Sequence, residues 1–478
     1  MTTDEVKQKP IGSKDTKKLV ILIVVMICIA IAAFLPPPEG LGDKGLIMLS
    51  IAMGAAILWM TEALTIGVTG LFIIFLQSIF GILPLTQGLA YIAHPVNAVV
   101  LVGYLLAGAL VNSGMDRRLS LTIISKMGEK TSQLILGIMI ATAFLSMWMS
   151  NTATTAIMVP IATGILTMAG AKPLKSNFGK ALFISIAFAA NIGGMGTPTG
   201  TPANPIAIAL LNNLAGIQLT FLDWTARALP LVILLIPAAW MIVQKVYPLE
   251  IKVVEGGLDA VKKQLKEMGP LQREEKRVVV LFISAVTLWL MDSFISLPSD
   301  WLYIVAVLLT IIIVTPKVGF MPWQEAQKLI GWDVLFLVGG GLSMGAGLKA
   351  TGAIDWIAGI LSSGMGSMPE SIAIGLISAA TGLGITIFCS LSGTATTFVP
   401  VAIGLALSFG WDPIAFAVAA GLSSSFAFLL PANAAPNAVA YGSGYFKTID
   451  MFKAGVVMII ASIVIQGILA GFLLPLIF

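Results

Sequence analysis

Long runs of apolar residues constrain the fold of this chain more than any other feature of its sequence. An α-helix needs about 20 apolar residues to cross a bilayer, and several runs meet or approach that length. They lie at 19–35, 45–60, 232–246, 278–295, 301–314 and 455–478. Only 10% of the residues are charged, against about 25% in an ordinary soluble domain. The alternating pattern of a membrane β-barrel is absent. The sequence therefore predicts an all-α polytopic membrane protein with about eleven transmembrane helices.

The basic residues indicate which side of the membrane each loop faces. Along a path that starts with a cytoplasmic N-terminus, 24 of the 27 Lys and Arg residues fall in loops on one side. The positive-inside rule makes that side cytoplasmic. We therefore expect a cytoplasmic tail at 1–18, a first transmembrane helix at 19–43 and a cytoplasmic linker at 245–277. The first apolar run is too long for a signal peptide and lacks its small-residue cleavage site. The predicted location is the cytoplasmic membrane.

Few residues suit metal binding or covalent chemistry. Cys28 and Cys389 lie in apolar runs, where small buried side chains are the simplest interpretation, and they define no disulfide or metal framework. His94 is the only histidine, which gives histidine-based catalysis little support. A nucleic-acid partner is not expected, because the basic linker also carries six acidic residues.

The chain contains an internal repeat. Three short motifs of the first half recur in the same order in the second half, at spacings of 242, 236 and 233 residues. They are 150–155 with 392–397, 101–103 with 337–339, and 202–207 with 435–440. Counted in helices, the second half begins on the opposite side of the membrane from the first. We therefore expect an inverted-topology repeat with halves at 44–244 and 278–478, an architecture found in many secondary transporters.

Each half contains two segments that are poor uninterrupted spans. Segment 131–169 is interrupted by polar residues and has basic residues at both ends, which predicts a re-entrant hairpin with its tip near 150–152. Segment 372–408 predicts a second hairpin from the other side, with its tip at 392–394. The remaining two are helices broken by Gly and Pro. These are 181–211, broken at 193–202, and 412–441, broken at 431–436.

These interruptions predict a binding site. Unpaired backbone groups at bilayer depth cost several kcal/mol each, so they persist where protein, water or ligand satisfies them. Freed carbonyls with Ser, Thr and Asn oxygens suit a hard monovalent cation, and helix N-termini suit a carboxylate. Gly and Pro are also common in membrane helices without such a role. The pairing of the breaks between the two halves favours the functional interpretation.

At these residues the sequence resembles the divalent anion/sodium symporter family of dicarboxylate, citrate and sulfate carriers. The resemblance runs from about residue 45 to the C-terminus. Its motifs are Trp59-Met60-Thr61-Glu62-Ala63-Leu64, Ala141-Thr142-Ala143-Phe144-Leu145-Ser146-Met147-Trp148-Met149-Ser150-Asn151-Thr152, Asn191-Ile192-Gly193-Gly194, Gly339-Gly340-Gly341-Leu342 and Pro436-Asn437-Ala438. The resemblance implies a homodimer in which a transport domain moves against a scaffold as an elevator, with no enzymatic activity and no cofactor except a possible Na⁺.

The resemblance also implies site residues. Substrate contacts would come from Ser150, Asn151, Thr152, Thr201, Pro202, Ser392, Gly393 and Thr394, with Ala434 and Ala435 at the second break. A possible sodium site would use Ser146, Ser150, Asn151 and carbonyls near Gly196 and Gly200.

Two departures from the family pattern fall in the same half-site. Gly393 stands where the family usually has Asn, and Ala434-Ala435 replaces the second Thr-Pro pair. Both changes delete oxygen ligands or hydrogen-bond donors. Our hypothesis is therefore an exchanger of C4-dicarboxylates or 2-oxoglutarate. The alternatives are a sodium-coupled dicarboxylate symporter, a citrate or sulfate carrier and, from other classes, a membrane serine hydrolase or a channel.

Two isolated charges have structural interpretations. Glu62 follows an apolar run, where we expect it to cap a helix end. Lys349 lies in an apolar stretch, where we expect its ammonium group to reach a polar boundary.

Overall fold

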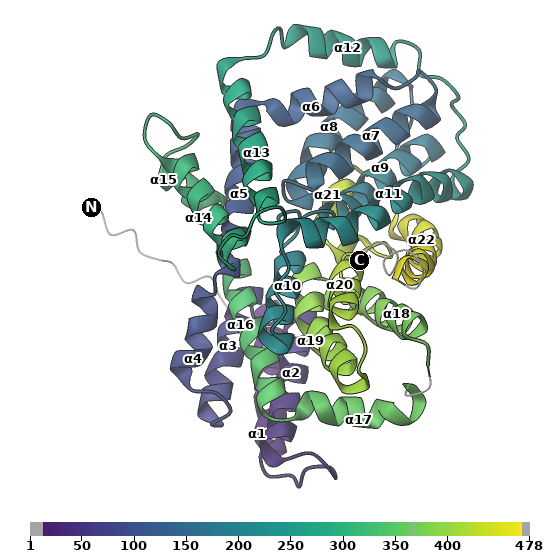
Figure 1. Cartoon of the computed structure of the whole chain (residues 1–478). Helices are drawn as coiled ribbons and strands as arrows, with labels where there is room; N and C mark the ends of the chain where they lie inside the picture. The colour runs from purple at the N-terminus through teal and green to yellow at the C-terminus, as the bar shows by residue number, and fades with distance from the viewer. Residues whose placement is uncertain (1–12, 366–367, 471–478) are drawn as a thin grey trace.

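The computed structural model describes residues 13–365 and 368–470, and Figure 1 shows the arrangement of its helices. Within these residues the only β pairing is an isolated bridge between Lys130 and Val253. The prediction of an all-α protein is confirmed.

Residues 13–246 form eleven α-helices and one 3₁₀ turn, of which α1 precedes the first half. They are α1 (Ser13–Ala32), α2 (Asp43–Thr61), α3 (Ile66–Ile79), α4 (Leu85–Ala90), η1 (Tyr91–Ala93), α5 (Val96–Ser113), α6 (Met115–Ser125), α7 (Thr131–Ser146), α8 (Asn151–Met168), α9 (Asn177–Gly194), α10 (Ala203–Ala215) and α11 (Phe221–Val246). Polar side chains set several starting points. Ser176 and Thr220, for example, accept backbone N–H groups at the starts of α9 and α11, as N-cap residues commonly do.

The linker and the second half are also built from α-helices, with one 3₁₀ turn. Their elements are α12 (Gly257–Glu267), α13 (Arg273–Met291), α14 (Trp301–Val314), α15 (Trp323–Leu329), α16 (Trp332–Ala350), α17 (Ala353–Met365), α18 (Glu370–Phe388), α19 (Leu391–Phe409), α20 (Pro413–Ser423), η2 (Pro431–Asn433), α21 (Ala435–Tyr441) and α22 (Thr448–Ile468).

Eight helical segments of the described chain are long and apolar enough to cross a membrane. They are α2, the combined segment Leu85–Ser113, α8, α11, α16, α18, α19 and α22. Shorter apolar helices include α3, α7, α14 and α20. Several expected spans are thus divided into shorter pieces or carry charged ends, and the count of eleven stays a prediction.

Corresponding helices of the two halves exchange packing partners. Helix α5 packs on α14, whereas its counterpart α16 packs on α3. Helix α8 packs on α9 and α21, whereas α19 packs on α20 and α10. Figure 1 shows α21 beside α8 and α9, and α10 beside α19 and α20. This reciprocal pairing is what an inverted repeat would produce, although the division at 44–244 and 278–478 stays a prediction.

Helix α9 lies at the centre of the packed core. Every residue from 181 to 194 is buried, and a helix that is apolar all round belongs in a protein interior. Helix α1 is the opposite case, because apolar side chains such as Leu19 and Ile31 are more than half exposed. The core therefore surrounds the helix that leads into the first Gly/Pro break.

The ends of the broken segments differ in places from the sequence prediction. The first hairpin turns at 147–150 and the second at 389–390. The second turn comes earlier than predicted because Ser390 caps α19, its hydroxyl accepting the Gly393 N–H at 3.2 Å. Ser392–Thr394 therefore lies in the first turn of α19. The break in the second helix runs from 424 to 434 and includes η2, so it begins and ends earlier than the predicted 431–436.

The linker is tied to the first half by Arg118 of α6. Its guanidinium donates to Glu275 Oε1 at 2.7 Å, to Gly269 O at 2.9 Å and to Met268 O at 3.1 Å. The Glu275 side chain is only 2% exposed. A second attachment joins Thr131, at the start of α7, to the carbonyl of Lys252 at 3.0 Å. The linker therefore contacts both α6 and the first hairpin.

The two isolated charges occupy helix ends. Glu62 is the C-cap of α2, with a left-handed φ of 49°. Lys349 donates to Leu214 O at 2.5 Å, near the end of α10. A cation there also meets the negative end of a helix dipole.

Candidate functional site

The tip of the first hairpin is formed by local capping. Helix α7 ends at Ser146, and Ser150 starts α8 by accepting the Ala153 N–H at 3.3 Å. Asn151 is then the first residue of α8, where free N–H groups and the helix dipole create a partial positive charge.

Three oxygen atoms lie close together beside this tip, and only one of them, the Ser146 hydroxyl, carries a proton. Ser146 Oγ lies 2.7 Å from Asn151 Oδ1 and 2.7 Å from Ala190 O. One hydroxyl can donate to only one of these acceptors at a time. The single hydroxyl proton therefore cannot satisfy both acceptors at once. On the other side of the same amide, Asn151 Nδ2 is buried and has no hydrogen-bond partner.

Glycines in the broken helix allow the hairpin tip to approach closely. A Cβ at Gly194 would lie 2.3 Å from Asn151 Oδ1, and a Cβ at Gly200 would lie 2.4 Å from Gly194 O and 3.0 Å from Ser146 O. No other residue fits these positions without movement. The backbone of the break is thus held directly against the oxygen cluster.

Side chains satisfy much of the freed backbone in this break. Asn204 Nδ2 donates to Gly194 O at 2.8 Å and to Thr197 O at 2.7 Å. Trp224 Nε1 donates to Met195 O at 3.0 Å, and the Thr197 hydroxyl donates to Met147 O at the hairpin tip. Sequence reasoning did not assign these roles, although Asn204 belongs to the repeated motif 202–207.

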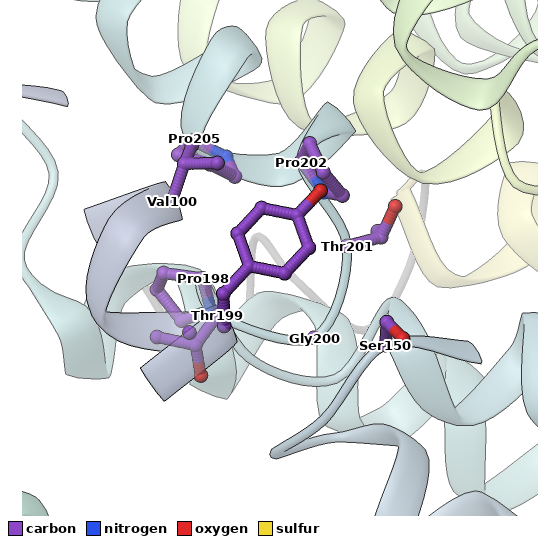
Figure 2. Close-up of a pocket in the computed structure, with 10 residues that line it drawn as sticks. Val100, Ser150, Pro198, Thr199, Gly200, Thr201, Pro202 and Pro205 are labelled. Carbon is purple, nitrogen blue, oxygen red and sulfur yellow. The ribbon is translucent and has the colours of Figure 1, made fainter. Parts of the chain in front are cut away.

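A small cavity of about 30 Å³ lies beside the tip. Ser150, Gly200, Thr201 and Pro202 border it, and Figure 2 shows Ser150 and Thr201 on one side with Val100 of α5 across from them. The Thr201 hydroxyl is buried and has no partner. Ser150 is the N-cap of α8 and Pro202 that of α10, so two helix N-termini meet at one cavity.

The oxygen cluster is not repeated among the described residues of the second half. At the spacing of 242 residues, Ser146 corresponds to Phe388 and Asn151 to Gly393. Phe388 is buried and packs edge-on against Phe398, with ring centroids 6.0 Å apart. The counterparts of the two side-chain oxygens are therefore an aromatic ring and a hydrogen atom.

The second break repeats the internal bracing of the first. Asn437 Nδ2 donates to Ala427 O at 2.7 Å and to Leu430 O at 3.0 Å, as Asn204 does in the first break. Asn191 Nδ2 donates to Asn437 Oδ1 at 2.8 Å, which joins α9, just before the first break, to α21, just after the second. Ala434 and Ala435 add no side-chain donor.

The structure brings together part of the predicted site. Ser146, Asn151 and Gly200 surround the oxygen cluster, and Gly196 lies against Met147 of the tip. Ser150, Thr201 and Pro202 line the cavity, and Thr152 is half-buried in the first turn of α8. The cavity lining does not include Ser392, Gly393, Thr394, Ala434 or Ala435. A cradle formed by both hairpin tips thus stays a prediction.

The site is uncharged and lies inside a bundle of apolar helices. Within the described ranges, no three His, Cys, Asp or Glu side chains cluster in a way that could hold a metal ion. Paired breaks, helix N-termini and neutral oxygens define the membrane-transporter class.

Comparison with known families identifies the transporter family to which the chain belongs. The model of the sodium:sulfate symporter transmembrane region matches residues 14–477. The chain belongs to this family, which confirms the resemblance predicted from the motifs. A family of transporters also sets the serine-hydrolase alternative aside.

Curated relatives match over almost the whole chain. The sodium-dependent dicarboxylate transporter SdcS of Staphylococcus saprophyticus is 31% identical over 485 residues, covering 97% of this chain and 92% of the relative. The protein of the same name from Staphylococcus aureus is 30% identical over 491 residues, covering 98% and 93%.

Two solved structures share the fold. The YdaH transporter of Alcanivorax borkumensis aligns with a TM-score of 0.52 at 13% identity, covering 97% of this chain and 100% of that one. MtrF of Neisseria gonorrhoeae aligns with a TM-score of 0.57 at 12% identity, covering 97% and 95%. At these identities the similarity concerns the fold alone.

Proposed function

We propose that this protein carries C4-dicarboxylates or 2-oxoglutarate across the cell membrane by exchanging one anion for another. The substrate class is supported by the SdcS relatives, which are named dicarboxylate transporters. The exchange mode is supported by the difference between the two half-sites.

The convergence of two helix N-termini on one cavity is the observation that carries the anion site. Helix N-termini present free N–H groups and partial positive charge, which suit carboxylates. Asn151 Nδ2 and the Thr201 hydroxyl are buried without partners beside these ends. Ser150, Thr152 and Pro202 complete the first half-site. One carboxylate of the substrate would accept hydrogen bonds from the Asn151 amide, from the Ser150, Thr152 and Thr201 hydroxyls and from free backbone N–H groups of the two helix ends, whereas Pro202 supplies no donor.

The second half-site offers the substrate less. Ser392 supplies a hydroxyl in the first turn of α19, the Thr394 hydroxyl there donates to Ser390 O at 2.8 Å, and Gly393, Ala434 and Ala435 supply only backbone groups. The second carboxylate would therefore depend on the α19 N-terminus and the Ser392 hydroxyl. A second cation at this half-site would lack counterparts of the Ser146 hydroxyl and the Asn151 amide oxygen.

A cation fits the first half-site better than the second. Ser146 Oγ, Asn151 Oδ1 and Ala190 O form a compact oxygen set, and carbonyls near Gly196 and Gly200 lie next to it. A bound Na⁺ would supply one positive charge beside the anion. The corresponding Phe388 and Gly393 provide no side-chain oxygen, so we propose at most one side-chain sodium site.

Uptake into proteoliposomes tests the exchange mode. Radiolabelled succinate should enter vesicles loaded with malate and should enter empty vesicles only slowly, with or without a sodium gradient. Strong sodium-driven uptake into empty vesicles would refute exchange. Competition by citrate and sulfate in the same assay would separate the alternative substrates.

Sodium-coupled symport is the second candidate. The relatives are named sodium-dependent, and the oxygen cluster of the first half-site is intact. Under this alternative one cation site would suffice for coupling, and removal of sodium would abolish uptake into empty vesicles.

We further propose an elevator mechanism in a homodimer. The reciprocal pairing of α8 with α21 and of α19 with α10 supports two interlocked repeats that could move as one body. Cross-linking in membranes tests the dimer, and cysteine pairs between α5 and the 195–202 loop that cross-link in only one transport state test the movement.

A further inference from the structure

One wall of the anion cavity comes from outside the hairpin and the broken helix. Val100, Gly103 and Tyr104 of α5 line it opposite Ser150 and Thr201. Tyr104 is the largest of the lining side chains, because the others are Val, Gly, Ser, Thr and Pro. Its size makes it the residue that most limits the free volume.

Helix α5 lies directly against the first break. A Cβ at Gly103 would lie 3.3 Å from Thr199 O, which places the α5 backbone against the 195–202 loop. Tyr104 follows Gly103 on α5. Its hydroxyl would lie 2.5 Å from a Cβ at Gly331, which is the N-cap of α16. The phenol therefore reaches from α5 past the cavity to the start of α16.

The repeat does not require an aromatic residue at this position. At the spacing of 236 residues, Tyr104 corresponds to Gly340. A Cβ at Gly340 would lie 2.3 Å from Gly70 Cα, so that position serves close helix packing. The tyrosine is thus a feature of the first half alone, where the cavity is.

The cavity is too small for a dicarboxylate while the ring keeps this position. A water needs about 10–15 Å³ of such volume, so about 30 Å³ holds roughly two waters. A four-carbon diacid is several times larger. Tyr104 is half-buried, and its hydroxyl end occupies the space that a side chain at Gly331 would fill.

We propose that Tyr104 sets the upper size limit of the transported anion by closing the cavity from the α5 side. This inference rests on the proposed function. A short diacid fits when the ring turns partly aside. A longer one needs space that the ring occupies in either position. The ring acts through its bulk, so the hydroxyl is dispensable.

Competition by diacids of increasing length tests this proposal. Malate-loaded proteoliposomes would take up labelled succinate in the presence of glutarate or adipate. A well-fitted pocket discriminates about 10–200-fold per methylene, so we expect wild type to favour succinate over adipate at least about tenfold. Tyr104→Ala should reduce that preference about tenfold or more, and Tyr104→Phe should keep it. Tyr441→Ala, which removes an exposed tyrosine elsewhere, should also keep it.

Each outcome decides a different question. An unchanged preference in Tyr104→Ala, or an equal loss in Tyr104→Phe, would overturn the size role. If Tyr104→Ala does not fold, Tyr104→Leu tests the same loss of bulk with a smaller cavity. If wild type takes up no dicarboxylate, the proposed function fails and this inference fails with it. If wild type discriminates and the variants do not differ, only this inference fails.

Discussion

Replacing Gly393 by Asn should introduce sodium stimulation of transport. The change adds an amide in the first turn of α19, at the position that corresponds to Asn151 in the repeat. A Cβ there would lie 3.4 Å from Ser390 Cβ and Oγ and 3.8 Å from Trp59 Cε3. These are ordinary van der Waals distances, so the Cβ fits without movement of the backbone.

The expected magnitude follows from the group that is added. A hydrogen bond or polar contact to a charged partner contributes about 1.5–3 kcal/mol, and 1.4 kcal/mol is tenfold in an equilibrium constant. Phe388 still supplies no hydroxyl at the counterpart of Ser146, so we take the lower limit. Sodium should therefore lower the succinate concentration for half-maximal uptake about tenfold. Replacing Gly by Asn in a helix changes propensity by only a few tenths of a kcal/mol, so stability should not confound the result.

The assay compares uptake at equal internal malate with sodium or potassium outside. Gly393→Ala is the matched control, because it adds the Cβ without the amide. Wild type and Gly393→Ala should respond equally to the two cations, and Gly393→Asn should respond to sodium. If uptake by Gly393→Asn responds to sodium no more than uptake by Gly393→Ala, at equal protein incorporation, the argument is refuted. A wild type that already requires sodium would refute it as well.

Four further predictions concern the oxygen cluster, the linker and the charge balance of transport. Ser146→Ala removes the hydroxyl shared by Asn151 and Ala190, a loss of about 0.5–1.5 kcal/mol. Unlabelled succinate should then compete about three- to tenfold less well with labelled succinate for uptake. Unchanged competition would contradict the role of the oxygen cluster. Arg118→Ala leaves the buried Glu275 carboxylate without its cation, a loss of about 3–5 kcal/mol, and should expose 256–277 to protease. Arg117→Ala loses a side-chain bond to Gln264 but keeps the Arg118–Glu275 pair, and should not. Burial alone would raise the pKa of Glu275, but the hydrogen bonds from Arg118 and the Gln272 amide outweigh it and hold this pKa below 4.5. The Arg118–Glu275 ion pair should therefore persist above pH 4.5 and be lost as the pH falls through that lowered pKa. Protease cleavage of the wild-type linker that begins well above pH 4.5 would contradict the ion pair. Malate–succinate exchange should proceed at the same rate with or without an imposed membrane potential, and a strong dependence would indicate that net charge moves.

The sequence contained enough to predict the all-α membrane fold and the family. Apolar run length and the ordered motifs are local properties, so neither depends on knowing which helices touch. The first break was also readable, because 193–202 combines Gly and Pro so densely that no helix could continue through it.

Other features depend on contacts in the folded protein that the sequence alone does not show. The second hairpin offers two serines, Ser390 and Ser392, and only the fold decides which one caps α19. Tyr104 follows a repeated motif, yet its place at the cavity depends on α5 meeting the 195–202 loop. The bond from Asn191 to Asn437 likewise joins residues 246 positions apart.

Charge balance links the altered half-site to the proposed exchange. A dicarboxylate carries two negative charges, and the neutral site adds none. Moving one charge against 100 mV costs about 2.3 kcal/mol, so net entry of a dianion into a negative interior costs about 4.6 kcal/mol per 100 mV. One cation at Ser146 and Asn151 would cancel half of this, and a second would have to bind where Phe388 and Gly393 offer no side-chain oxygen. Exchange of one dianion for another moves no net charge and needs neither cation. The loss of the second oxygen set is therefore tolerable for an exchanger and costly for a concentrating symporter.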